Sequence, residues 1–336
     1  MHPRSVSLEE PPHAVEAAFG RRVVRYARGS SAREPATRSM EELEGDLDFI
    51  LREVSARAER GELEDACALA QARAFVDDRM RAIRRDLARA KAERAEGGVE
   101  RCARALERTC AHDVTRERAM RRESGYDASA ATLRDEQLAK TFGMLLGCYD
   151  ELGMPERGMR GEAYASLFLC ARVREEDGAR GRLAVDLRRL KLGASSLGMR
   201  IVRALTCGNH VEFFRLVESP ECSYEHACEL ERHFAVVRIE ALRAMNAAMN
   251  STPMSLDELA RILRLDSAGD AATMAKMCKL AVDDEDETVS FRTSAFAHPN
   301  LRDTDVAAAL RAIPSSFVDA KRAHALEVES APVSAE

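Results

Sequence analysis

Apolar side chains recur every three to four positions over long stretches of this sequence. The spacing appears at residues 39–60, 138–152 and 227–248. It places the apolar side chains on one face of an α-helix, which can then pack against a neighbouring helix. Ser39 and Glu42 add a capping box at the start of the first segment. These segments therefore predict amphipathic helices.

Residues that break helices are scarce, because the 336-residue chain contains only 18 glycines and 10 prolines. The helix-favouring residues Ala, Leu, Arg and Glu dominate. The sequence therefore predicts an all-α fold of stacked antiparallel helix pairs in a solenoid-like array. Further helices are expected at residues 63–93, 99–113, 162–174, 183–205 and 211–217, with breaks at 97–98, 153–155, 178–181 and 219–220.

The sequence changes character after Pro253. Short helices are expected at residues 256–265 and 270–280, followed by an acidic turn and the β-branched run 288–291. This order is typical of a winged helix with a small β-hairpin, whose first helix would be residues 222–250. The predicted organisation is a disordered tail (1–20), a helical-repeat part (21–221), a winged-helix part (222–297), a short helical segment (298–318) and a second disordered tail (319–336).

Composition narrows the functional classes. The chain has 51 Lys and Arg against 57 Asp and Glu, a net charge of -6, so nucleic-acid binding would need a local basic patch. Nine cysteines without a C-x-x-C pair fit a reducing compartment. No apolar stretch has the length of a signal peptide or a membrane helix, so neither export nor a membrane partner is expected.

Sequence motifs that carry chemistry do not occur. Phosphate-binding glycine loops, the G-x-S-x-G elbow and the H-E-x-x-H zinc motif are all missing. Metal-ligand types gather only at Cys222, His226, Cys228 and His233. Cys228 falls on a different helix face, so we expect buried cysteines and half-exposed histidines there. The acidic run 283–287 lacks the spacing of a calcium loop. We predict no enzyme activity, metal or cofactor.

The densest charged segment, residues 75–87, combines an apolar stripe with arginines and aspartates. Asp77 and Asp78 are spaced along a helix to pair with Arg81. The charges also fit clamps between helices, made by contacts from arginine to carboxylate. The candidate clamp residues are Phe75, Asp78, Arg79, Arg81, Arg84 and Asp86.

These clamp candidates resemble the signature of the Sac-three/GANP family of PCI-type scaffold proteins. A second segment, residues 208–216, resembles the most recognisable later motif of that family. Its candidate residues are Gly208, Asn209, Phe213, Phe214 and Arg215. Further segments that resemble the family follow in order at 23–32, 106–112, 136–141, 149–150 and 238–245. The resemblance covers residues 20–297.

The resemblance implies a helical PCI domain that pairs with a second PCI subunit and, through it, with a small acidic protein. It also implies a non-catalytic scaffold subunit of a nuclear mRNA-export complex of the TREX-two type, located in the nucleus or at its envelope, with the cytoplasm as the alternative. Ala90 stands where the family usually has glutamine. The sequence lacks the Phe-Gly repeats and the long helix of the large members, so pore docking and centrin binding are not implied.

The paired winged helices of such a complex form a platform for RNA. The candidates for this contact here are Arg261, Arg264, Lys276 and Lys279. The alternative is that these residues are solvated charges beside the apolar faces of two short helices. The acidic turn at 283–287 would repel phosphate, so we expect contact with the RNA backbone rather than groove insertion.

Two other functions remain open. The first is a centrosome- or spindle-associated adaptor, as assigned to short family members that contain little beyond this domain. The second is a PCI subunit of a proteasome-lid, signalosome or initiation-factor particle. Localisation through the cell cycle and co-sedimentation with large particles separate these functions from mRNA export.

Overall fold

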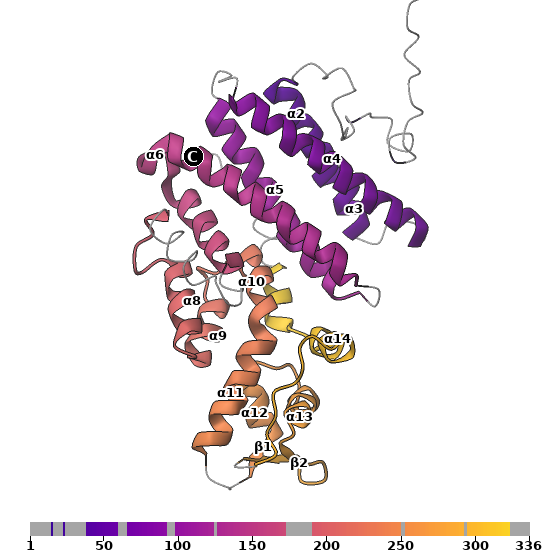
Figure 1. Cartoon of the computed structure of the whole chain (residues 1–336), viewed down its shortest axis with the longest axis vertical. Helices are drawn as coiled ribbons and strands as arrows, with labels where there is room; N and C mark the ends of the chain where they lie inside the picture. Colours follow the sequence, from indigo (N-terminus) through magenta and orange to yellow (C-terminus); the bar gives the residue numbers. More distant parts are fainter. Residues whose placement is uncertain are drawn as a thin grey trace, which may run out of the picture. The chain divides into compact units, whose positions relative to one another are not determined.

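The computed structural model describes residues 15, 23, 38–59, 66–92, 98–123, 126–172, 190–249, 253–291 and 294–322. Most of these residues are helical, and the sheet found among them has three short strands (Figure 1). The predicted all-α fold with a small β-hairpin is confirmed. The chain divides into two compact units, of which unit 1 is 1–112 with 136–156 and unit 2 is 113–135 with 157–336.

Unit 1 consists of packed helices. They are α2 (Met40–Asp48), the π-helical η1 (Phe49–Ser55), α3 (Ala56–Glu59), α4 (Ala66–Ala92), the first part of α5 (Gly98–Arg121) and the middle of α6 (Ala128–Arg172). Figure 1 shows α2, α4 and α5 side by side. Leu43, Leu47 and Ile83 from the apolar stripes are at most 1% exposed, as the periodicity predicts. The capping box is present, with Ser39 N donating to Glu42 Oε2 at 2.8 Å.

The break predicted at residues 153–155 does not end a helix. α6 runs from Ala128 to Arg172, so the separate helix predicted at 162–174 is its last part. Gly153 nevertheless has a left-handed φ of 79°. A left-handed residue cannot continue regular α-helical geometry. The glycine therefore distorts α6 at the predicted position without dividing it.

The helices that follow in unit 2 are shorter. They are α8 (Leu197–Thr206), α9 (His210–Glu218), α10 (Tyr224–Leu230), the 3-10 segment η2 (Glu231–His233) and α11 (Phe234–Ala248). Residues 191–196 form turns rather than the predicted helix, and the break predicted at 178–181 lies outside the described residues. The predicted helix at 222–250 is interrupted by η2, where the chain tightens for three residues. Within the described ranges, no helix combines the length and apolar character needed to span a membrane.

The C-terminal part of unit 2 follows the order helix, strand, helix, helix, strand, strand. After α11 come β1 (Met254–Ser255), α12 (Leu256–Leu263), α13 (Ala268–Met277), β2 (Ala281–Asp283), β3 (Thr288–Ser290) and then α14 (Thr304–Ala312). The antiparallel sheet has the order β1-β3-β2. This is the element order of a winged helix, with β1 as a strand that the sequence did not predict.

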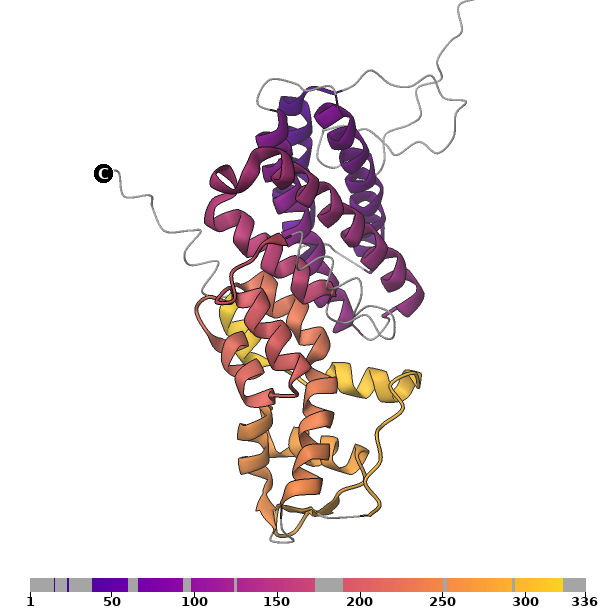
Figure 2. The ribbon, with the colours of Figure 1, turned by 60° about the vertical axis from the view of Figure 1, so that its left-hand side comes forward.

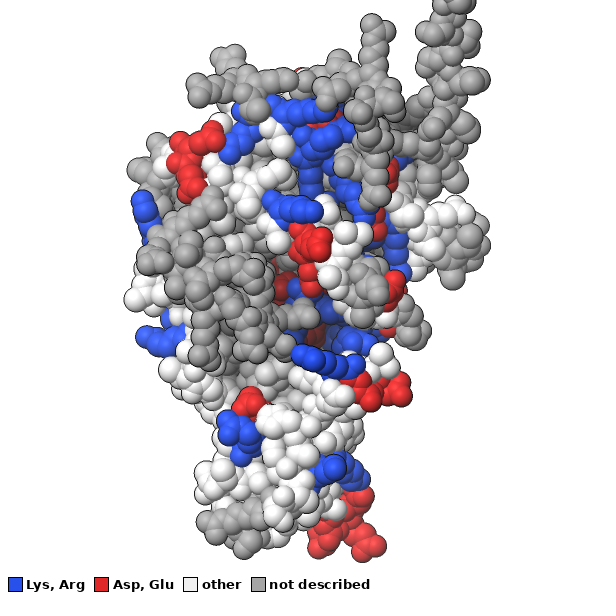
Figure 3. All heavy atoms as spheres, viewed as in Figure 1, with Lys and Arg blue, Asp and Glu red and all other residues white. Residues whose placement is uncertain are grey.

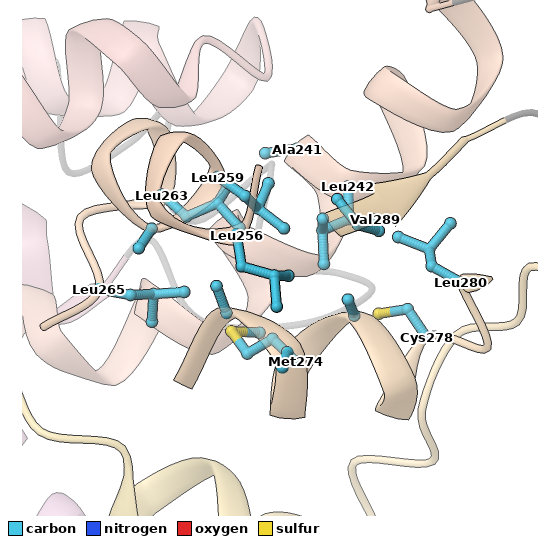
Figure 4. Close-up of a cluster of buried hydrophobic side chains, with 14 of the residues drawn as sticks. Ala241, Leu242, Leu256, Leu259, Leu263, Leu265, Met274, Cys278, Leu280 and Val289 are labelled. Carbon is cyan, nitrogen blue, oxygen red and sulfur yellow. The ribbon is translucent and has the colours of Figure 1, made fainter. Parts of the chain in front are cut away.

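A compact apolar core holds this C-terminal part together (Figure 4). Leu259 and Leu263 of α12, Val289 of β3 and Cys278 are fully buried. Val289 is paired with Val282 of β2 on one side and with Met254 of β1 on the other. The middle strand therefore carries the side chain around which both helices and both neighbouring strands pack.

The segment after α14 packs on the helices of unit 2 (Figure 2). Residues 316–322 are helical, so helix continues past residue 318, where a tail was expected to begin. The rings of Phe317 and Phe234 stack with centroids 5.4 Å apart. Lys321 Nζ donates to the carbonyl oxygens of Ser219 and Cys222 at 2.9 and 2.8 Å.

Candidate functional site

The first motif lies along α4, and most of its residues are buried in unit 1. Arg79 is 2% exposed, and its guanidinium carbon lies 4.6 Å from the centre of the Phe75 ring. This position is favourable because the ring face is electron-rich. Arg79 also pairs with Asp78, and Arg81 is half-buried. Arg84 is buried as well. These residues belong to the packing of unit 1.

Asp86 ties α4 to the start of α2. Its Oδ2 accepts a hydrogen bond from Arg38 Nε at 2.8 Å, and its Oδ1 accepts one from Arg85 Nε at 2.7 Å. Arg38 also donates to Asp46 of α2 at 2.5 Å. Burial raises the pKa of Asp86, but the bonds from Arg85 and Arg38 outweigh burial and hold the pKa below its usual value. A clamp between helices therefore forms here, with Arg38 as the partner that the sequence did not indicate.

The segment of α5 that resembles the family makes similar ties. Glu107 is buried and accepts a hydrogen bond from the hydroxyl of Tyr149 on α6 at 2.7 Å. Arg108 pairs with Asp48 at the end of α2. Buried or partly buried charges are stable only with such partners. The polar motif residues of unit 1 thus hold neighbouring helices together.

The second motif makes the turn from α8 to α9. Gly208 has a left-handed φ of 65°, which glycine adopts without steric cost. The N–H groups of Gly208 and Asn209 donate to the carbonyls of Leu205 and Ala204, as in a Schellman motif. The Asn209 side chain then caps α9 by accepting from the N–H of Glu212 at 3.0 Å. Two adjacent residues therefore end one helix and start the next.

The aromatic pair of the second motif is core. Phe213 and Phe214 are both buried and lie edge-to-face, with centroids 5.2 Å apart. The ring of Phe234 contacts both of them. Both rings of the pair therefore face the core rather than solvent. Arg215 points outward and forms a bidentate pair with Glu212, both bonds measuring 2.7 Å.

Three of the four candidates for nucleic-acid contact are ion-paired in the structure. The pairs are Arg261 with Glu258 at 3.8 Å, Arg264 with Glu218 at 3.0 Å, and Lys276 with Asp284 at 2.6 Å. Each carboxylate reduces the positive potential that a phosphate would meet. In the structure each of these three cations therefore lies beside a carboxylate rather than as an isolated charge.

Lys279 differs from the other three. It is exposed, and its side chain has no ion-pair partner among the described residues. It is the second residue after α13 and has a left-handed φ of 57°. The next residue, Leu280, donates to the carbonyl of Ala275 at 3.0 Å. The backbone of Lys279 therefore ends the helix, and its ammonium group is exposed to solvent.

The turn between β2 and β3 is acidic and is closed by hydrogen bonds within it. Asp283 Oδ1 accepts hydrogen bonds from the N–H groups of Glu285 and Asp286 at 3.0 and 3.1 Å. Figure 3 shows acidic side chains gathered at this end of unit 2, on a surface with few basic groups. The acidic turn expected from the sequence at residues 283–287 is therefore present between β2 and β3.

Sequence reasoning missed a second polar network, within unit 2. Buried Arg118 donates to Glu231 at 2.6 Å and to Asp319 at 2.8 Å. Arg232 pairs with Glu229 at 2.9 Å. The partners of Arg118 lie 113 and 201 positions further along the chain, so no local spacing reveals them.

The two histidines considered as metal ligands take part in packing. His226 and His233 are buried rather than half-exposed, and both rings lie within hydrogen-bond distance of carbonyl groups of α6. His226 Nε2 lies 2.9 Å from the carbonyl oxygen of Ala163, and His233 Nε2 lies 3.2 Å from that of Cys170. Burial lowers the pKa of His226, which keeps the ring neutral.

Helices held by buried charged ties, followed by an end with winged-helix element order, place the chain among all-α proteins of the helical-repeat class. The SAC3/GANP family model matches residues 4–284, and the chain belongs to this family. SAC3 family protein 1 of Schizosaccharomyces pombe is 36% identical over 97 residues, which are 28% of this chain and 10% of that protein. The match thus spans a tenth of that relative's length.

Proposed function

We propose that the chain is a non-catalytic scaffold subunit of a nuclear mRNA-export complex of the TREX-two type. The match to the SAC3/GANP family over residues 4–284 carries the proposal. The motif residues Phe75, Asp86, Phe213 and Phe214 are all buried, so they maintain the shape of the helical units. A scaffold needs this property, because its partners recognise a fixed surface.

The proposed partners are a second PCI subunit and, through it, a small acidic protein. The elements from α11 to β3 have the order of a winged helix and share their own apolar core. A part with its own core can present a fixed surface to a second subunit, which supports pairing of this kind. We propose a nuclear location for the assembled complex.

Affinity purification of the tagged chain from its native cells, followed by mass spectrometry, tests the scaffold proposal. We expect a second PCI protein and a small acidic protein in near-equal amounts. Recovery of the chain alone as a stable monomer would overturn the proposal. Recovery with spindle or centrosome proteins would support the adaptor, and co-sedimentation with proteasome-lid, signalosome or initiation-factor particles would support that alternative.

We further propose that the complex contacts the RNA backbone through Lys279. Lys279→Gly removes the charge and places glycine at a left-handed position, so the fold should be preserved. Binding of single-stranded RNA by the purified complex should weaken, and the salt dependence of log K should become shallower by roughly 0.7, the value for one phosphate contact. Lys140→Ala, at an exposed lysine of α6, is the control. Equal binding by wild type and Lys279→Gly at low salt would exclude this contact.

A further inference from the structure

A short helical segment near the C-terminus covers an apolar surface of unit 2. Residues 315–322, called the C-terminal segment below, follow α14, and Val318 is fully buried in the core that the segment shares with α9 and α11. The ring of Phe317 stacks on Phe234 with centroids 5.4 Å apart and lies perpendicular to Phe214 at 6.5 Å. One aromatic and one aliphatic side chain therefore anchor the segment.

A carboxylate of the segment meets two arginines. Asp319 Oδ1 accepts a hydrogen bond from Arg118 of α5 at 2.8 Å, and Asp319 Oδ2 accepts one from Arg122 at 3.0 Å. Hydrogen bonds between ionised groups are stronger than those between neutral groups. The Asp319 side chain is 47% exposed, so solvent screens both ion pairs. These contacts therefore select for a carboxylate more than they add to affinity.

Two further contacts set the direction of the helix. Lys321 Nζ donates to the carbonyl oxygens of Ser219 and Cys222 at 2.9 and 2.8 Å, in the turn that follows α9. At the other end, the N–H of Ser316 donates to the carboxylate of Asp266 at 2.9 Å. A reversed helix would present carbonyl groups to this carboxylate, which accepts hydrogen bonds and cannot donate them. The surface is therefore selective for one direction of a bound helix.

The connection that leads to the segment is lightly packed. Residues 300–305 are all exposed. Within α14, a helix that the structure describes in full, only Leu310 is buried. Parts of a protein with few buried contacts open at a low cost in free energy. The segment can therefore leave its position while the core of the winged-helix part stays folded.

The surface and the segment that covers it differ in their relation to the family. Arg118, Phe214 and Phe234 lie within the residues that match the family model, 4–284, whereas the segment lies beyond them. The part of the chain that matches the family thus supplies the surface, and the part beyond the match supplies the helix that covers it.

We propose that this surface binds a short helix of a partner protein and that the C-terminal segment blocks it in cis. The partner helix has the chemistry of the segment, with an aromatic side chain, a carboxylate two residues later and an ammonium group four residues later, as in Phe317, Asp319 and Lys321. A helix that lays its apolar face on an apolar surface is a common mode of peptide recognition. The partner binds only when the segment leaves, so the contact in cis is autoinhibitory.

Binding of a labelled peptide by the full-length chain tests the proposal. The peptide has the sequence of residues 313–322 and carries fluorescein, so fluorescence anisotropy measures its binding. Phe317→Ala combined with Lys321→Ala in the protein should free the surface. This double variant should bind the peptide about tenfold more tightly than wild type, whose own segment competes at an effective concentration on the order of 1 mM. Equal affinities, or no binding by the folded double variant, would overturn the proposal.

Circular dichroism checks that the double variant is folded. If it is not, Lys321→Ala alone takes its place, because this change keeps the Phe317 ring. The same difference from wild type is then expected in the same direction, and its absence would count against the proposal.

A substitution of the surface tests the recognition of the carboxylate. Arg122→Ala, added to the double variant, should weaken binding of the peptide but should not change binding of a peptide with Asp319→Ala. Arg215→Ala, at an exposed side chain paired with Glu212, is the control and should leave both affinities unchanged. Equal weakening of both peptides by Arg122→Ala would overturn the assigned chemistry.

Size-exclusion chromatography tests the other possible occupant, the segment of a second copy of the chain. Wild type and the double variant should both elute as monomers. A wild-type dimer that dissociates in the double variant would show that two copies exchange their segments, and the proposal of a blocked partner site would be wrong.

Discussion

Arg238 of α11 donates a hydrogen bond to the carbonyl oxygen of Leu263 at the end of α12, with 2.9 Å between Nε and the oxygen. The guanidinium group also donates to the carbonyl of Arg264. Its carbon lies 5.2 Å from the ring centre of Phe234. The last carbonyls of a helix have no partner within the helix. One buried side chain therefore closes α12 and attaches it to α11.

Arg238→Met should destabilise unit 2 by about 2–4 kcal/mol, because two buried carbonyl groups lose their donor. Urea unfolding followed by circular dichroism measures the change. Arg243→Met, on the same helix at a side chain that is 56% exposed, should change the free energy of unfolding by less than about 0.5 kcal/mol. Equal effects of the two substitutions would contradict the capping role of Arg238.

Asp86→Asn should destabilise unit 1 at neutral pH by about 2 kcal/mol, because the contacts with Arg38 and Arg85 lose their charge. The folded pKa of Asp86 is lowered, so its contribution is complete above the ordinary aspartate pKa and is lost as pH falls through the folded value. The difference between wild type and variant should therefore shrink in acid. Unfolding at a series of pH values measures it.

Asp319→Asn is the matched control for Asp86→Asn. The pKa of Asp319 is also lowered, because the bonds from Arg118 and Arg122 outweigh the effect of burial. Its side chain is 47% exposed, so solvent screens the pair and the loss should stay below about 1 kcal/mol. A larger loss at Asp319 than at Asp86 would contradict the expectation that the more buried carboxylate makes the stronger contact.

Phe213→Ala and Phe214→Ala should each cost about 3–5 kcal/mol, because both rings are fully packed. Arg215→Ala, the next residue of the motif, should cost less than about 0.5 kcal/mol because its side chain is exposed. Thermal unfolding of the three variants distinguishes core from surface. A loss below about 1 kcal/mol at Phe213 would contradict its place in the core.

Gly198→Ala should destabilise unit 2 by about 1–3 kcal/mol, because the added Cβ would lie 2.8 Å from Ser166 Cα, where backbone cannot yield. At Gly143 of α6 an added Cβ meets nothing within 4 Å. Gly143→Ala should therefore stabilise the protein by up to about 1 kcal/mol, through helix propensity. Chemical denaturation of the two alanine variants gives the sign of each change, and the same sign at both positions would contradict the close contact.

Features that depend on neighbours in sequence could be predicted. The apolar stripe with Leu43 and Leu47 and the capping box at Ser39 need only the helical repeat, and both are found. Gly153 shows where local reasoning is incomplete. The sequence identifies the distortion, but packing decides whether the helix ends there.

Features that depend on distant partners could not be predicted. β1 contains two residues and exists only through its pairing with β3. Lys276 was a candidate for RNA contact because the sequence does not show that Asp284 lies across the hairpin turn from it. The partners of Arg118 are beyond any helical spacing. The resemblance identified the family, while the roles of single charges required their three-dimensional surroundings.

α5 and α6 each supply residues to both units, since unit 1 takes 98–112 and 136–156 and unit 2 takes 113–135 and 157–172. Neither unit is therefore a continuous stretch of chain. A truncation after residue 112 would remove the α6 segment that carries buried Phe142 and Leu145. A fragment that begins at 157 would lack Arg118, the partner of Glu231 and Asp319. Folding of either unit must wait until the whole α5–α6 hairpin has been synthesised.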